Sequence, residues 1–124
     1  MEKITNSHLR QFSGSCNFYR YGRSFVLTEG VHYLITRCQC HWLVDVVISY
    51  QPQFIRDLML QGIQFWELEK TGDYTGVIRC LRDEDDIVVT QELEYTDFFK
   101  YFGDDKVRLY FIPPAYTLML PSEY

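Results

Sequence analysis

Apolar residues recur with a helical period in the first half of the chain. The first stripe predicts a helix that starts after Thr28, with Glu29 favourably placed in its first turn; its members are Val31, Leu34, Ile35 and Cys38. A second stripe with related spacing follows: Trp42, Leu43, Val46, Val47 and Tyr50. Because Gln39-Cys40 contains no strong helix breaker, the stripes fit two helices or one bent helix. Pro52 is expected to end the second stripe, and a third helix over residues 53–60 to stop at Gly62.

Beyond Gly62 the period falls to two residues, which is typical of β-strands. Four strands are expected, over residues 63–70, 76–82, 86–95 and 107–112. Turn-forming residues 71–73 and 83–85 separate the first three strands, and a short helix is expected after Thr96. In the third strand Ile87, Val89, Leu93 and Tyr95 share one expected face. One apolar and one polar face indicate an antiparallel sheet covered on one side.

These elements predict a single α+β domain over residues 1–124, with N-terminal helices packed on one face of a roughly four-stranded antiparallel sheet. Residues 12–27 are harder to place, although a strand pair turning near Tyr21-Gly22 fits the aromatic stretch there. The tail is expected to pack back through Leu118 and Leu120.

Composition places the chain among globular proteins, with 47% hydrophobic and 23% charged residues. The apolar stretch 42–48 is far shorter than the ~20 residues that cross a bilayer, so no membrane association is expected. The first residues lack the apolar region of a secretory signal, which favours a cytoplasmic location and reduced cysteines.

Charge is distributed unevenly and excludes ordinary nucleic-acid binding. Residues 1–62 hold six basic and four acidic residues, a net charge of +2, whereas residues 63–124 hold six basic and thirteen acidic residues, a net charge of −7. An acidic surface repels the phosphate backbone. No nucleic-acid partner is therefore expected.

Cys38, Cys40 and His41, with His32 nearby, form the densest group of metal-ligating residue types. Their spacing is poor for zinc, because a second ligand pair is missing. The same residues could form a cysteine–histidine nucleophile pair, yet neighbours on a helix diverge by about 100° and no orienting residue is recognisable. We therefore favour inert, buried thiols for Cys16, Cys38, Cys40 and Cys80, and expect neither metal nor cofactor.

Carboxylates offer two further candidates. Asp45 interrupts an apolar stretch, where it could be a buried acid with a raised pKa or, as we favour, the acceptor of a structural hydrogen bond. Several glutamates, Glu67, Glu69, Glu92 and Glu94, are expected to line one exposed sheet face. Arg79, Arg82 and Lys70 on neighbouring strands make cross-strand ion pairing the simplest interpretation.

Several segments resemble a family of small bacterial proteins of unknown function. They are residues 25–34, Trp42-Leu43-Val44-Asp45, Gln64-Phe65-Trp66, residues 94–98 and the end Leu120-Pro121-Ser122-Glu123-Tyr124. The resemblance covers most of the chain from residue 12 onward. It implies a single cytosolic domain and no particular activity.

A surplus of aromatic residues, 17% of the chain, without an assembled catalytic set favours a non-enzymatic binding or protein-interaction module. Its partner would be a protein or a second copy, and its candidate contact residues are Trp42, Asp45, Trp66, Tyr19 and Tyr21. One alternative is an enzyme with acid and base groups at Asp45 and His41. Another is an acidic decoy that occupies a partner's nucleic-acid groove.

Overall fold

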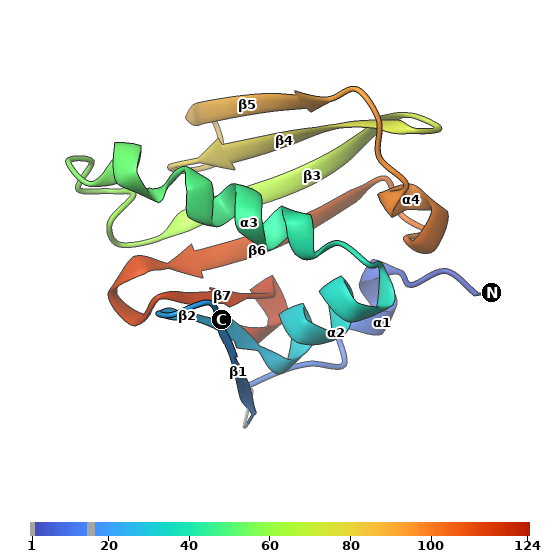
Figure 1. Ribbon diagram of the computed structural model, residues 1–124, viewed down its shortest axis with the longest axis horizontal. Coiled ribbons are helices and arrows are strands. Elements are labelled where there is room, and N and C mark those ends of the chain that lie inside the picture. The colour runs from blue at the N-terminus through green and yellow to red at the C-terminus, as the bar shows by residue number, and fades with distance from the viewer. Residues whose placement is uncertain (1, 15–16) are drawn as a thin grey trace.

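One seven-stranded sheet forms the centre of the protein, whose computed structural model describes residues 2–14 and 17–124 (Figure 1). The strand order is β1-β2-β7-β6-β3-β4-β5. Neighbouring strands are antiparallel except β2 and β7, which are parallel. The strands are β1 (Phe18–Tyr21), β2 (Phe25–Thr28), β3 (Gln64–Gly72), β4 (Thr75–Leu81), β5 (Ile87–Leu93), β6 (Lys106–Ile112) and β7 (Thr117–Met119).

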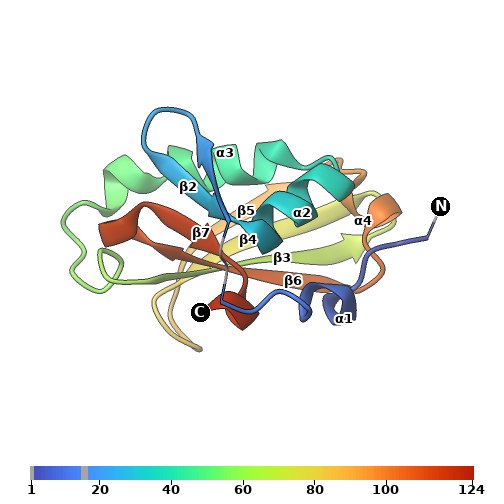
Figure 2. The same ribbon diagram turned by 90° about the horizontal axis from the view of Figure 1, so that it is seen from below.

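The helices are short. They are α1 (Asn6–Leu9), α2 (Glu29–Arg37), α3 (His41–Ser49) and α4 (Phe98–Tyr101), with 3₁₀ turns η1 (Gln51–Phe54), η2 (Pro113–Ala115) and η3 (Pro121–Glu123). Figure 2 shows α2 and α3 along one side of the sheet and α1 on the other. None of the described helices has the length and apolar character that a bilayer-crossing helix needs.

The predicted architecture of N-terminal helices packed on a roughly four-stranded antiparallel sheet is wrong. The sheet has seven strands, and the parallel pairing of β2 with β7 makes it mixed. Two strands precede α2 in the chain, so the helices do not form an N-terminal layer. Strands β1, β2 and β7 are only four, four and three residues long, which is too short for an alternating pattern to stand out.

Alternation along the central strand β3 separates the two faces of the sheet. Trp66 and Leu68 are buried in the core, whereas Phe65, Glu67 and Glu69 are partly exposed on the opposite face. Buried residues of α2 and α3 belong to the same core: Val31, Leu34, Ile35, Leu43, Val44 and Val47. The helix side of the sheet is therefore covered, and much of the opposite face is left open.

The two helical stripes belong to two helices. Gln39 lies between them with φ 51°, a left-handed conformation that ends the helical hydrogen-bond pattern. The helix predicted over residues 53–60 is replaced by η1, with Pro52 in its first turn, and by successive turns. The strand pair expected near Tyr21-Gly22 is present as β1 and β2, and Gly22 supplies the left-handed residue, φ 64°.

The start of α2 is capped by a side chain from the far end of the chain. Thr28 is the N-cap residue of α2, but its side chain does not accept a hydrogen bond from the first turn of that helix. The Thr28 hydroxyl instead donates to Glu123 Oε1 at 2.6 Å. The amide of Gly30 donates to Glu123 Oε2 at 3.1 Å, and the amide of Leu120 to Oε1 at 3.1 Å. A Cβ on Gly30 would lie 2.5 Å from Leu120 Cδ1 and 2.6 Å from Glu123 Oε1, so any larger residue would displace these side chains. We call Thr28, Gly30, Leu120 and Glu123 the Glu123 cluster.

Replacement of Glu123 is expected to destabilise the whole fold. Glu123→Ala leaves the buried Thr28 hydroxyl and the Gly30 amide without this acceptor, at an expected cost of about 2–3 kcal/mol in the free energy of unfolding. Urea unfolding followed by tryptophan fluorescence measures the loss. The control is Glu94→Ala, which removes an exposed carboxylate and should change stability by less than about 0.5 kcal/mol. Equal stabilities for the two variants would contradict the structural role of Glu123.

Candidate functional site

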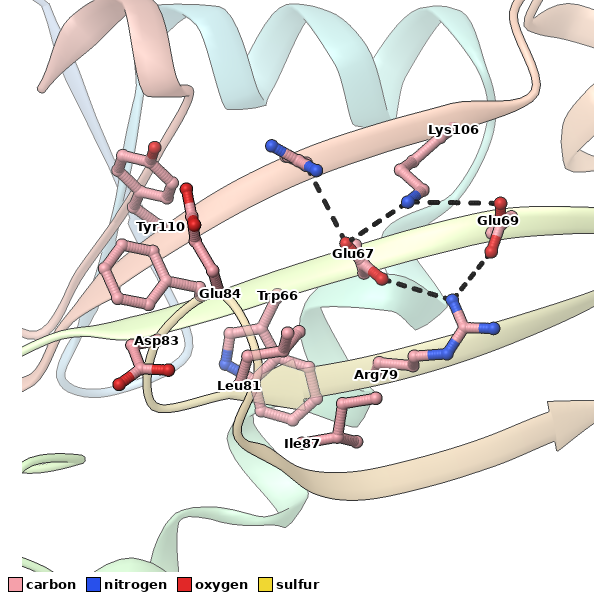
Figure 3. Close-up of a pocket in the computed structure, with 12 residues that line it drawn as sticks. Trp66, Glu67, Glu69, Arg79, Leu81, Asp83, Glu84, Ile87, Lys106 and Tyr110 are labelled. Carbon is pink, nitrogen blue, oxygen red and sulfur yellow. Dashed lines mark hydrogen bonds and ion pairs between the residues drawn. The ribbon is translucent and has the colours of Figure 1, made fainter.

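A cavity of about 720 Å³ lies on the open face of the sheet, over β3, β4 and β6. The turn between β4 and β5 bends over one side of it (Figure 3). Figure 2 shows this turn projecting from the side of the sheet opposite α2 and α3. The cavity has a charged end, formed by β3, β4 and β6, and an apolar end, to which β5 also contributes.

The register of the strands brings the charged residues together. Glu67 of β3 is directly opposite Arg79 of β4 on one side and Arg108 of β6 on the other. Glu69 is opposite Lys106 in the same way. Because residues two apart on a strand share a face, all five side chains lie on the open face.

Three cations surround two carboxylates at this end (Figure 3). Arg79 Nη1 donates to Glu67 Oε1 at 3.1 Å and to Glu69 Oε1 at 2.7 Å. Lys106 Nζ lies 3.6 Å from Glu67 Oε2 and 3.9 Å from Glu69 Oε2. Arg108 Nε lies 3.7 Å from Glu67 Oε2. The Glu67 side chain, only 11% exposed, therefore contacts all three cations.

The hydrogen bond between Arg79 and Glu69 favours the charged form of both. It lowers the pKa of Glu69 below its ordinary value and raises the pKa of Arg79. A carboxylate that acts as a general acid at neutral pH needs a raised pKa. Glu69 is thus suited to holding an ion pair and unsuited to donating a proton.

The apolar end is formed by Phe65, Leu81, Ile87 and Tyr110. Phe65 and Tyr110 are a cross-strand pair with ring centroids 5.1 Å apart in an edge-to-face arrangement. A β-bulge puts Ile87 opposite Leu81, while Val89 is opposite Cys80. The prediction that Ile87 and Val89 share a face is therefore wrong, because the extra residue of the bulge reverses the alternation.

Acidic residues form the rim beside the apolar end. Asp83 and Glu84 lie on the turn between β4 and β5, as the sequence predicted for this charge run. Arg82 anchors the turn through Nε to Asp57 Oδ2 at 2.7 Å and Nη1 to Asp86 Oδ2 at 3.0 Å. The rim is therefore held in place by ion pairs at its base.

The aromatic residues selected from the sequence lie elsewhere or beneath this site. Trp66 is 2% exposed, and its indole nitrogen donates to Gln64 Oε1 at 2.9 Å in the core under the cavity. Trp42 is half-buried against the core. Tyr19, on β1, is 37% exposed and stacks on His32 with ring centroids 3.8 Å apart. Trp66 is among the residues that line the cavity, whereas Trp42 and Tyr19 are not.

Asp45 accepts a hydrogen bond from a tyrosine hydroxyl. Tyr21 Oη donates to Asp45 Oδ1 at 2.7 Å, and the Asp45 side chain is exposed. Burial, together with this bond, raises the pKa of Tyr21 to about 12. His41 is also exposed, and only its backbone carbonyl approaches the pair, 3.3 Å from Tyr21 Oη. The hydrogen bond between Tyr21 and Asp45 links β1 to α3.

The described thiols are buried. Burial raises the pKa of Cys38 and of Cys80 to about 12, and it also raises the pKa of Cys40. Cys16 lies outside the described residues. Over residues 2–14 and 17–124, no three histidine, cysteine or acidic side chains gather so that they could hold a metal ion.

Some residues of the site could be predicted from the sequence, and others could not. Pairing of Glu67 and Glu69 with Arg79 was predicted and is confirmed. The contributions of Lys106, Arg108 and Tyr110 were missed, although their spacing of two residues places them on one face of a strand. What the spacing did not reveal is that β6 lies directly beside β3.

The chain belongs to a family of unknown function, DUF6876, whose sequence profile matches residues 3–124. No curated protein and no solved structure matches the chain.

The ion pairs of Arg79 are expected to stabilise the protein in a pH-dependent way. Because the pKa of Glu69 is lowered from 4.5, this stabilisation is fully present above about pH 4.5 and is lost as the pH falls through the lowered pKa. The free energy of unfolding of Arg79→Gln should therefore differ most from wild type at pH 7 and least at pH 3. Arg23→Gln, at an exposed position, is the matched control. A difference for Arg79→Gln that does not change with pH would contradict this assignment.

The buried thiols are expected to be unreactive in the folded protein. A thiol with a pKa of about 12 is ionised in only about one molecule in ten thousand at pH 8, and it is shielded as well. In a Cys16→Ser variant, a thiol-specific chromogenic reagent should label no cysteine rapidly until urea is added, and then three. Rapid labelling of the folded variant would show that one of these thiols is accessible.

Proposed function

We propose that this protein is a non-enzymatic binding module, and that it holds the apolar part of a small molecule in the cavity on the open face of its sheet. The observation that carries the proposal is the cavity itself. Its volume of about 720 Å³ falls within the range of roughly 300–1,000 Å³ that is usual for small-molecule sites. Seven of the twelve lining residues are charged and the others are apolar or aromatic, which suits a ligand with both a polar and an apolar part.

Rigid neighbours support the apolar end. Phe65 and Tyr110 project from adjacent paired strands, and Tyr124 packs edge-to-face on Tyr110 with ring centroids 5.5 Å apart. A pocket whose walls stand on paired strands is largely formed before the ligand arrives, which reduces the entropy cost of binding. Leu81 and the half-exposed Ile87 complete a surface suited to an aromatic or branched aliphatic group.

Binding explains the charged residues better than catalysis does. Glu67 and Glu69 are held by three cations, and the lowered pKa of Glu69 opposes a role in proton transfer. Asp45 and His41, the other acid–base candidates, are exposed on α3, and they do not line this cavity. These features support a site that recognises a ligand and leaves it unchanged.

Ion pairing within the acidic half of the chain also favours a binding module over an acidic decoy. Glu67, Glu69 and Asp86 are neutralised by Arg79 and Arg82. A decoy needs an uninterrupted acidic surface to replace the phosphates of a nucleic acid. Here the acids of β3 alternate with cations from both neighbouring strands.

The proposal predicts that a neutral apolar dye binds in the cavity. N-phenyl-2-naphthylamine should become fluorescent with the wild-type protein, and Ile87→Asp should weaken its binding by about tenfold or more, because a carboxylate would be desolvated beside the dye. Ile87 is 51% exposed, so the substitution should leave the fold intact.

Ile55→Asp is the matched control. It makes the same change at a side chain that is 68% exposed and does not line the cavity. Its dye affinity should equal that of wild type. The proposal fails if the wild-type protein does not bind the dye, or if both variants weaken binding equally.

A further inference from the structure

A second hollow of about 290 Å³ adjoins the cavity on the open face of the sheet. Lys106 and Arg108 of β6 line both spaces, so the two meet along this strand. The remaining lining residues come from the segment around α1 and from the tail: Asn6, Leu9, Arg10, Leu120, Pro121 and Ser122. Three of the eight lining residues are cations, and none of them is acidic.

The cations of this hollow retain capacity to bind an anion. The Arg108 side chain is 62% exposed, and its ion pair with Glu67 is made through Nε at 3.7 Å, longer than a hydrogen bond. Arg10 is exposed as well. The contacts of Lys106 with Glu67 and Glu69, at 3.6 and 3.9 Å, are equally loose. The short hydrogen bonds to both carboxylates come from Arg79, on the far side of β3.

The polar groups around the hollow are otherwise engaged. The side-chain Nδ2 of Asn6 donates to the backbone oxygen of Lys106 at 2.8 Å, and the backbone N–H of Asn6 donates to Asp104 Oδ2 at 2.7 Å. Ser122 Oγ lies 3.4 Å from the backbone oxygen of Leu9. Recognition at this position therefore depends on the three cations, and arginine presents a planar set of donors that matches a carboxylate or a phosphate.

We infer that the hollow beside Lys106 and Arg108 is an anion subsite, and that the ligand of the open face is a small amphipathic organic anion. The inference rests on the proposed function, since it assigns the apolar part of that ligand to the cavity. Lys106, Arg108 and Tyr110 follow one another along one face of β6, about 7 Å apart. The anionic group, a carboxylate or phosphate, thus lies about 7–13 Å from the centre of the apolar group.

Charge balance supports an anion over a cation. This part of the face has a local positive charge, although the whole chain carries a net charge of −5. It holds four cations and two carboxylates: Arg10, Arg79, Lys106 and Arg108, with Glu67 and Glu69. Local positive charge on an acidic protein concentrates anions at that position. The acidic residues Asp83 and Glu84 lie at the other end, over the apolar part of the cavity.

The test compares two dyes that share an apolar body. The 2,6 isomer of anilinonaphthalene sulfonate carries an anionic group at the end of its naphthalene remote from the anilino ring, and N-phenyl-2-naphthylamine carries none. The double substitution Arg10→Gln with Arg108→Gln should weaken binding of the sulfonate dye about tenfold more than binding of the neutral dye, because two charged hydrogen bonds to the anionic group are lost. Arg23→Gln with Arg56→Gln removes two exposed arginines that line neither space and should change neither affinity.

The outcomes separate this inference from the proposed function. If both dyes bind and the double variant retains wild-type affinity for the sulfonate dye, the anion subsite is refuted and the proposed function stands. If the neutral dye does not bind, the proposed function fails.

Inorganic phosphate then tests the subsite alone. It should shift the backbone amide NMR signals of Lys106, Arg108 and Ser122 in the wild-type protein and not in the double variant. Unchanged signals up to tens of millimolar phosphate would overturn the inference.

Discussion

The parallel pairing of β2 with β7, completed by the Glu123 cluster, is the contact on which the rest of the structure depends. It joins the N-terminal hairpin to strands from the second half of the chain and so creates a single sheet. The Val26 amide donates to the Tyr116 carbonyl at 2.8 Å at the start of this pairing. Glu123 then binds the first turn of α2, where the absence of a side chain on Gly30 leaves room for Leu120. Segments about ninety residues apart therefore depend on each other to fold.

This contact also shapes the open face. Once β7 is in place, η3 and the tail lie beside α1, where Ser122 meets Leu9, and they close one end of the face. The turn between β4 and β5, anchored by Arg82, closes the other. Long-range contacts thus form the walls, while local alternation along β3, β4 and β6 supplies the floor.

The floor of the open face has a charged part and an apolar part. Within the ion cluster, pairing with three cations allows the Glu67 carboxylate to be only 11% exposed, and the three cations outnumber the two carboxylates by one charge. The paired rings of Phe65 and Tyr110 continue the same face as its apolar part. A face with one net positive end and one apolar end is chemically suited to a ligand that is itself amphipathic.

The sequence alone determined the local features, which depend on neighbouring residues: the α2 and α3 stripes, the alternation in β3, β4 and β6, the turns between them, and the pairing of Arg79 with Glu67 and Glu69. Short strands such as β7, the bulge that turns Ile87 into the cavity and the left-handed Gln39 have no distinct local pattern. Only the tertiary structure decided which strands are neighbours, and hence that Lys106 and Arg108 join the ion cluster and that Glu123 caps α2. The physical reason is that pairing across the sheet is selected by the burial and hydrogen bonding of the whole chain, and no short window of residues contains that information.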